Sequence, residues 1–291
     1  MFTLQMPRSG TKMIFAFILS SLLTIQAGVL VDEANCNGIK INGQYYDEEI
    51  LKRDLDRPYS LAVDYSPNIL YFSYNIKGTS DDEFRSARLN LITKEFSNIE
   101  GVNNGFAQTV DQKTHEVYIG GSDGIYKYDY ATNNAELYAQ KGSNIWHLYF
   151  NQSLYFSIFP TQVLYVLRDG NPSRFEYLED TKVDHFVIDN ENDIFFTNAT
   201  GLYSVKAESK NATLYAENPV VRSLTTDKNG NVYVCLQDGI YAVRKPTLSL
   251  EKIYSIDDGF GLAFDNENNM VYADATKLVR LKLNLKNKCN S

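Results

Sequence analysis

The stretch that decides the fold is FVIDNENDIFFTN, from Phe186 to Asn198. An apolar run leads into an aspartate, a polar turn follows, and a second run rich in aromatic residues comes after the turn. The same pattern returns as LTTDKNGNVYVCL (residues 224–236) and as LAFDNENNMVYAD (residues 262–274). Short apolar runs bounded by Asn, Asp and Gly are typical of paired β-strands, and their recurrence indicates a repeat architecture.

Three earlier copies extend the pattern over most of the chain: LAVDYSPNILYFSY (61–74), QTVDQKTHEVYIG (108–120) and LYFNQSLYFSI (148–158). Each copy turns at one polar pivot residue, and the pivots are Asp64, Asp111, Asn151, Asp189, Asp227 and Asp265. Successive pivots lie 47, 40, 38, 38 and 38 residues apart, the first interval being lengthened by an insertion at residues 78–83. An aspartate suits a tight turn because its carboxylate accepts hydrogen bonds from backbone N–H groups.

Each unit continues with two further strand-like runs. The third run reads GLYSVK at residues 201–206, and the fourth reads ATLYAE at 212–217 or SRFEYLE at 173–179. Four short strands per ~40 residues are the signature of a propeller blade. Six copies therefore predict an all-β protein, a six-bladed β-propeller. A TIM barrel would need helical segments between the strands, and the sequence contains none of them.

The two ends of the mature chain are expected to meet in the last blade. The sixth unit supplies only three strands before the chain ends, while GIKINGQYYDEE (residues 38–49) reads as a strand with an Asn-Gly turn. We expect this N-terminal strand to complete the last blade as its outer strand, with an irregular or short helical linker at residues 50–56. The propeller domain then comprises residues 57–291 together with 38–49, preceded by an N-terminal segment at residues 28–56.

Residues 1–27 have the pattern of a secretory signal peptide. Arg8 and Lys12 precede an apolar run at residues 13–23, and the small residue Ala27 follows. The apolar run is too short for a stable membrane span, and no later segment reaches ~18 apolar residues. The alternative interpretation is a buried N-terminal helix. We expect cleavage near Ala27 and a secreted protein with no membrane partner.

Secretion makes disulfide formation and N-glycosylation possible. The chain has three cysteines. We pair Cys36 with Cys289, because ring closure places them side by side, and expect Cys235 to be a buried small hydrophobic residue. Three Asn-x-Ser/Thr sequons predict glycosylation sites at Asn151, Asn198 and Asn211.

Composition limits the classes of function. Of the 291 residues 44% are hydrophobic and 13% aromatic, which excludes a disordered chain. The formal net charge is −8, and no basic run exceeds two residues. Nucleic-acid binding needs a basic surface, so no nucleic-acid partner is expected.

The repeat also predicts which residues meet at the mouth of the central channel. In a propeller the first strand of each blade lines the channel, and the residues just before it lie on one face. Five residues before the pivots stand Tyr59, Phe106, Trp146, Asp184, Arg222 and Phe260. Four residues before the pivots stand Ser60, Ala107, His147, His185, Ser223 and Gly261. The loops between the second and third strands are expected to reach the same face and add Ser122, Phe159, Gln237 and Asp274. The predicted ligand-binding residues are Tyr59, Phe106, Trp146, His147, Asp184, His185, Arg222 and Phe260.

These residue types favour a small planar ligand. Flat apolar walls with a few polar groups are what an aromatic ligand needs. Arg222 can hold a carboxylate or sulfate with two hydrogen bonds, while Asp184 or a histidine can orient an amine or phenol. The alternative is that the aromatic residues fill the channel as core and that Arg222 and Asp184 form an ion pair across it.

Catalysis finds less support in the residues. No metalloprotease, paired-cysteine or nucleophile-elbow motif occurs. A calcium-dependent lactonase would place a carboxylate and amides at the channel mouth, where aromatic residues occupy most positions and only Asp184 is acidic. His147 and His185 could ligate a metal with Asp184, but we expect two hydrogen-bonded structural histidines instead. We expect no catalytic residue, metal or cofactor.

The mature start, CNGIKINGQYYDEEILKRDLDRPYSLAVDYSPNILYFSYN (residues 36–75), resembles the ommochrome-binding proteins of moth haemolymph. The likeness extends through NGNVYVC (229–235) to the Lys-Cys pair at 288–289. The resemblance implies a secreted, non-enzymatic haemolymph carrier of tryptophan-derived phenoxazinone pigments such as ommatin D or xanthommatin. It implies no particular binding residue. We expect a monomer; the alternatives are a calcium-dependent extracellular propeller hydrolase and a secreted protein-interaction propeller.

Overall fold

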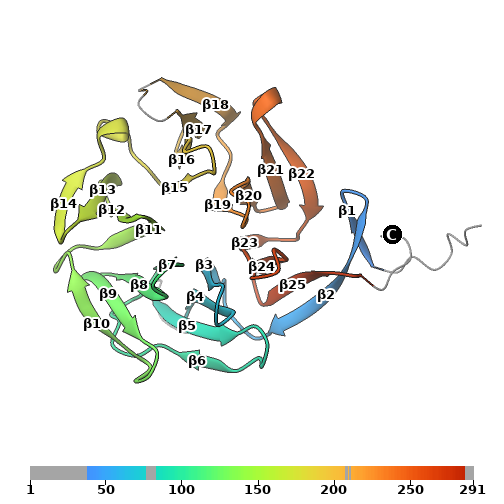
Figure 1. Cartoon of the computed structure of the whole chain (residues 1–291), viewed down its shortest axis with the longest axis horizontal. Coiled ribbons are helices and arrows are strands. Elements are labelled where there is room, and N and C mark those ends of the chain that lie inside the picture. The colour runs from blue at the N-terminus through green and yellow to red at the C-terminus, as the bar shows by residue number, and fades with distance from the viewer. Residues whose placement is uncertain (1–37, 77–82, 207–208, 210, 286–291) are drawn as a thin grey trace, which may run out of the picture. The chain divides into compact units, whose positions relative to one another are not determined.

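The fold was analysed in a computed structural model, which describes residues 38–76, 83–206, 209 and 211–285. Within these residues the strands form six antiparallel sheets, arranged as blades around a common axis (Figure 1). This confirms the predicted six-bladed β-propeller. The predicted signal peptide (residues 1–27) and both cysteines of the predicted disulfide, Cys36 and Cys289, lie outside the described residues.

The strands follow one another blade by blade along the chain. The first blade comprises β3 (Tyr59–Asp64), β4 (Ile69–Asn75), β5 (Phe84–Asn90) and β6 (Phe96–Asn98). The second comprises β7 (Ala107–Asp111), β8 (Glu116–Gly121), β9 (Gly124–Asp129) and β10 (Asn134–Ala139). The third comprises β11 (Ile145–Asn151), β12 (Ser153–Ile158), β13 (Val163–Arg168) and β14 (Asn171–Arg174). The fourth comprises β15 (His185–Ile188), β16 (Ile194–Asn198), β17 (Gly201–Val205) and β18 (Ala212–Glu217). The fifth comprises β19 (Val221–Thr226), β20 (Val232–Leu236), β21 (Gly239–Arg244) and β22 (Ser249–Ser255). The sixth comprises β23 (Gly259–Phe264), β24 (Met270–Asp274), β25 (Leu278–Leu283), β2 (Gln44–Lys52) and β1 (Ile39–Ile41).

The sixth blade joins the two ends of the chain, as predicted, but with two N-terminal strands instead of one. Strands β1 and β2 form a hairpin around Asn42 and Gly43, both with positive φ, and β2 pairs with β25. Asn-Gly supplies the backbone conformation that a two-residue hairpin turn needs. Because β2 runs on to Lys52, the linker predicted at residues 50–56 begins later than expected.

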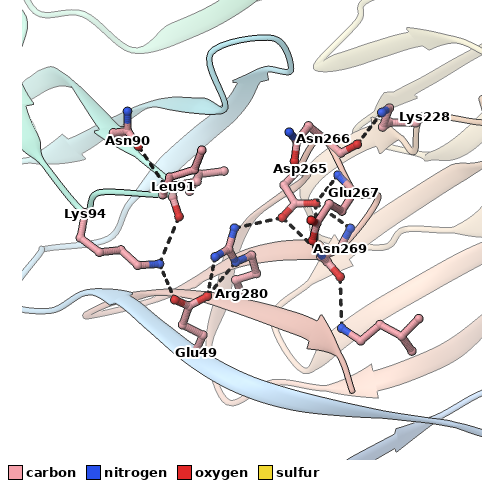
Figure 2. Close-up of polar contacts among 12 residues, drawn as sticks. Glu49, Asn90, Leu91, Lys94, Lys228, Asp265, Asn266, Glu267, Asn269 and Arg280 are labelled. Carbon is pink, nitrogen blue, oxygen red and sulfur yellow. Dashed lines mark hydrogen bonds and ion pairs between the residues drawn. The ribbon is translucent and has the colours of Figure 1, made fainter. Parts of the chain in front are cut away.

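A chain of ion pairs ties this seam together (Figure 2). Glu49 on β2 accepts hydrogen bonds from Arg280 on β25, at 2.6 Å from Nη2 and 2.8 Å from Nε. Its other oxygen lies 2.6 Å from the ammonium of Lys94 in the first blade. Arg280 also lies 3.2 Å from the carboxylate of Asp265, which is fully buried. The N-terminal strand is therefore linked to both the last blade and the first.

The apolar core lies between the blades. Among the described residues it divides into six clusters, and each cluster combines side chains of two neighbouring blades. The cluster at the seam, for example, packs Leu70 and Phe72 of the first blade against Val271 and Leu278 of the sixth. Each sheet thus buries both faces, which explains the nearly continuous apolar runs of the inner strands. Cys235 belongs to one cluster as a free, buried thiol, as predicted.

The pivot residues of the last three blades close their inner turns as expected. The carboxylates of Asp189, Asp227 and Asp265 each accept hydrogen bonds from the backbone N–H groups two and four residues later, at 2.8–3.0 Å. His115, in the turn between β7 and β8, contacts the pivot residue of the first blade. Its Nδ1 lies 2.8 Å from the buried carboxylate of Asp64, although 45% of its side chain is exposed.

One fourth strand is shorter than predicted. The run SRFEYLE was expected to form a strand, whereas β14 ends at Arg174 and a 3₁₀ helix, η2, covers Glu176–Leu178. The reason is packing, because Phe175 and Leu178 turn inward and are only 5% and 3% exposed. A second 3₁₀ helix, η3, covers Lys245–Thr247. In the part of the chain that the structure describes, no helix has the length and apolar character to cross a membrane.

Candidate functional site

The inner strands enclose a cavity of about 300 Å³ on the propeller axis, which we call the hub cavity. Strands β3, β7, β11, β15, β19 and β23 all contribute to its lining. The inner strands have two ends. The mouth end carries the residues that precede the pivots by four or five positions, and the turn end carries the pivots themselves. Neighbouring inner strands contact one another around the axis, so equivalent positions of the repeat lie at one level.

Six of the eight predicted ligand-binding residues line the hub cavity: Tyr59, Phe106, Trp146, His147, His185 and Arg222. Asp184 and Phe260 do not line it. Phe260 is 5% exposed and packs behind Tyr59 and Arg222. Of the loop residues predicted to reach the same face, Phe159 contacts Trp146, and none lines the cavity.

The aromatic side chains form a continuous belt at the mouth end. Ring centroids are separated by 5.2 Å between Phe260 and Tyr59, and by 5.6 Å between Tyr59 and Phe106. Phe106 and Trp146 are stacked at 5.3 Å with an interplanar angle of 28°. Since Tyr59, Phe106 and Trp146 are only partly buried, they form a wall with accessible surface and are not closed into the core.

Phe84 also belongs to this belt, although it was not among the predicted ligand-binding residues. Its ring lies 4.8 Å from Phe106 and 5.7 Å from Tyr59. It begins β5, directly after the insertion that only the first repeat contains, so no alignment of repeats assigns it a role. Its position just past that insertion was the one available signal.

Arg222 is held in the cavity wall by an aromatic ring. Its guanidinium carbon lies 5.0 Å from the ring centroid of Phe260, a cation–π contact between neighbouring blades. No ion pair joins it to Asp184, so the predicted alternative of an ion pair across the channel is wrong. Asp184 instead accepts a hydrogen bond from the amide of Gln162, and burial raises the pKa of its carboxyl.

His147 and His185 form a neutral, hydrogen-bonded pair. Nε2 of His147 lies 3.1 Å from the carbonyl oxygen of Phe186, and Nε2 of His185 lies 3.3 Å from that of Val221. A carbonyl only accepts, so Nε2 of His185 is assigned as the protonated nitrogen. Nε2 of His147 also lies 3.3 Å from the backbone N–H of Phe186, a donor, so its contacts are compatible with either tautomer. Burial lowers the pKa of His147 to about 4, and burial together with the neighbouring His147 lowers that of His185 to about 3. Both rings are therefore uncharged at neutral pH.

Residues beyond the pivots shape the turn end of the hub cavity. The side chain of Gln112 accepts from the backbone N–H of Tyr65 at 3.1 Å and donates to the carbonyl of Val63 at 2.7 Å. The Lys228 ammonium lies 5.2 Å from the ring centroid of Tyr65. Burial, assisted by Asp227, raises the pKa of the Tyr65 phenol to about 12, so it stays neutral. Tyr65 and Gln112 were not among the predicted residues, because each directly follows a pivot and the prediction used positions on the opposite face.

The arrangement is suited to binding a flat molecule. The walls are aromatic, the histidines are neutral and engaged with carbonyl oxygens, and a single guanidinium supplies charge. Within the described ranges no three His, Cys, Asp or Glu side chains are grouped so as to hold a metal ion. Such a cavity accommodates a flat, apolar molecule with a negative group.

Sequence comparison identifies a curated relative. The chain is 32% identical over 248 residues to the ommochrome-binding protein of Manduca sexta, an alignment that covers 84% of this chain and 90% of that protein. No protein-family profile matches the chain.

Structural comparison finds solved proteins with the same fold. A gluconolactonase from Xanthomonas campestris superposes with a TM-score of 0.69 at 12% identity, over 86% of this chain and 96% of that one. Regucalcin, a calcium-binding protein from Agrobacterium tumefaciens, superposes with a TM-score of 0.62 at 10% identity, over 82% and 96%. At identities this low the similarity shows the fold alone.

Proposed function

Because the chain belongs to the ommochrome-binding protein family, we propose that it binds an ommochrome, a planar phenoxazinone pigment, in the hub cavity. The observation that carries the proposal is the aromatic wall of Tyr59, Phe106 and Trp146 around a cavity that also contains Arg222. The pigment rings would stack on these side chains, and Arg222 would hold an acidic group. Micromolar affinity requires ~8 kcal/mol, which stacking, desolvation and one charge-assisted hydrogen bond can supply together.

We propose further that the protein is a secreted, monomeric, non-enzymatic pigment carrier in the haemolymph. The support comes from the signal-peptide pattern of residues 1–27 and from the sequons. Asn211 is exposed, and the amide oxygen of Asn198 is held by Thr200 in a surface turn, positions compatible with glycans. A Cys36–Cys289 disulfide would reinforce the same seam that Glu49 and Arg280 join. Protein purified from native fluid should be coloured, with the absorption spectrum of its pigment.

Fluorescence of Trp146 tests the binding site directly, because the chain has only one tryptophan. Titration with xanthommatin should quench this emission to a saturating limit and shift the visible absorption of the pigment to longer wavelength. Both changes should give the same Kd, since both report one site. An unchanged tryptophan emission at saturating pigment would falsify the placement in the hub cavity.

A Trp146→Phe variant provides the matched control. It removes the emission but keeps an aromatic ring in the wall, so the absorbance shift should persist with a Kd within about threefold of the wild-type value. Arg244, on β21 of the same blade as Arg222, does not line the cavity and pairs with Glu251 at its surface. Arg244→Gln should therefore leave both signals unchanged.

A further inference from the structure

The charge on the cavity wall is unbalanced. Among the described residues that line the hub cavity, Arg222 is the one side chain with a full charge, and no Asp or Glu is present. Asp184, the acidic residue at the equivalent position of the neighbouring blade, lies outside the lining and is bound to Gln162. A ligand in this cavity therefore meets one positive group and no negative one.

The guanidinium of Arg222 also lacks an acceptor. Within residues 38–76, 83–206, 209 and 211–285, no hydrogen bond or ion pair to it is formed, and its Nε is shielded from solvent without a partner. A buried donor without an acceptor is unfavourable, and a charged one more so. The guanidinium lies over the ring of Phe260, at 5.0 Å from its centroid, and a guanidinium can donate from Nε and a terminal nitrogen to one oxyanion.

The remaining polar groups add no charge that would alter this balance. The Nε2 atoms of His147 and His185 are used by the carbonyls of Phe186 and Val221, and the two rings contact each other edge to face at 5.7 Å. The amide of Gln112 is engaged with the backbone at both ends. The charge preference of the hub cavity is thus decided by Arg222.

The size of the cavity restricts the ligand further. Its volume of about 300 Å³ is at the lower end of the range that ligand pockets occupy, ~300–1,000 Å³. A fused bicyclic ring with one acidic substituent fits such a volume, whereas a pigment with amino-acid side chains would leave those chains outside the cavity.

We infer that the hub cavity binds small planar aromatic monoanions, such as fused bicyclic carboxylates, as ligands in their own right, with the carboxylate on Arg222 and the ring against Phe106 and Trp146. The inference rests on the proposed function, because it assigns the same cavity and asks which part of a ligand the cavity recognises. It also predicts discrimination against a positive group on the same ring, since a cation would face Arg222 with no carboxylate in the wall.

Three probes with the same ring and different charge test this inference by isothermal titration calorimetry. They are naphthalene-2-carboxylate, neutral 2-naphthylmethanol and cationic 2-naphthylmethylammonium. The carboxylate should bind about 10- to 100-fold more tightly than the alcohol, as a hydrogen bond to a charged group predicts, and the ammonium should bind most weakly. Equal affinity for the three probes would overturn the inference.

Two substitutions assign the effect to the residue. Arg222→Gln should lower the affinity for the carboxylate by about 10-fold or more and leave that for the alcohol within about threefold. Arg244→Gln, on the same blade but outside the cavity, should change neither. An Arg222→Gln variant that retains full carboxylate affinity would also contradict the inference, and a thermal unfolding curve confirms that the variant is folded.

Failure of the monoanion inference can be distinguished from failure of the pigment-binding proposal. If xanthommatin binds but the naphthalene series shows no binding or no charge preference, the pigment proposal stands and the monoanion inference is wrong. If neither xanthommatin nor the carboxylate binds the wild-type protein, both are wrong.

Discussion

Asp227 and Asp265 at the turn end differ from Arg222 at the mouth end in whether their charges have partners within the fold. At the turn end, Asp227 and Asp265 are nearly or fully buried, and each accepts several hydrogen bonds from its own turn. At the mouth end, Arg222 has no acceptor, and aromatic rings stand partly exposed. Polar groups that are satisfied within the fold stabilise it, whereas groups left unsatisfied are available to a ligand. Substitution of groups satisfied within the fold should therefore change stability, and substitution of Arg222 or of the exposed rings should change binding.

The largest effect is expected at Asp265. Its carboxylate is fully buried and holds two backbone N–H groups, the Asn269 amide and Arg280. Asp265→Ala leaves Arg280 without this partner in the interior, so the free energy of unfolding should fall by about 3–5 kcal/mol. Denaturant unfolding measures the loss. Asp111→Ala, at the equivalent but more exposed turn of the second blade, is the matched control, with an expected loss of about 1 kcal/mol. Equal losses would contradict the comparison.

Acid should destabilise the protein through the histidine pair. Burial lowers the pKa values of His147 and His185 to about 4 and about 3, below the ~6.5 of an unfolded chain. Between these values the unfolded chain binds more protons, so the free energy of unfolding falls as the pH drops below about 6.5. The loss by pH 5 should be on the order of 2 kcal/mol per histidine.

Replacement of the pair tests this origin. In a His147→Gln, His185→Gln variant the stability should become flatter between about pH 7 and pH 5. Arg244→Gln removes a guanidinium that does not titrate in this range and lies outside the hub cavity, so this variant is the control and should keep the wild-type slope. A double variant with an unchanged slope would show that other groups cause the pH dependence.

Phe106 should affect binding more than stability. Its ring is partly exposed and stacks on Trp146 at 5.3 Å, so Phe106→Leu removes an aromatic surface but keeps most of the apolar volume. The affinity for xanthommatin should fall by about 3- to 10-fold, corresponding to ~1 kcal/mol for an aromatic pair. The free energy of unfolding should change by less than about 1.5 kcal/mol. Unchanged pigment affinity would argue that the belt is structural.

Glu49 connects the seam to the turn end through Arg280, which also contacts Asp265. Its substitution should have the smallest effect on stability. Glu49→Gln weakens its contacts with Lys94 and Arg280, but Arg280 retains Asp265. Because Glu49 is about one-third exposed, the expected loss of stability is only about 1 kcal/mol. The loss should shrink in high salt, because the contact with Lys94 is partly solvated. A loss as large as that of Asp265→Ala would mean that the seam alone limits stability.

The repeat made much of the architecture predictable. A pivot every 38–47 residues placed six inner strands, and with them the level of Tyr59, Phe106, Trp146 and Arg222. The repeat did not predict the position of residues where one unit departs from the others. Phe84 follows an insertion found in a single repeat, and Phe175 turns inward because of a neighbour on the next blade. Such contacts depend on a residue far along the chain, which periodicity does not record.

From the sequence alone follow the number of blades, the closure of the ring by its N-terminal segment, and the set of residues at the mouth. These follow because strand period, turn chemistry and repeat length are local properties of the chain. The tertiary structure decides which of those residues share a cavity and which are already paired. Asp184 is bound to Gln162 and Phe260 lies behind the wall, while Arg222 is left without an acceptor. Whether a charged group is satisfied depends on the positions of every neighbouring donor and acceptor, and only the packed blades bring those together.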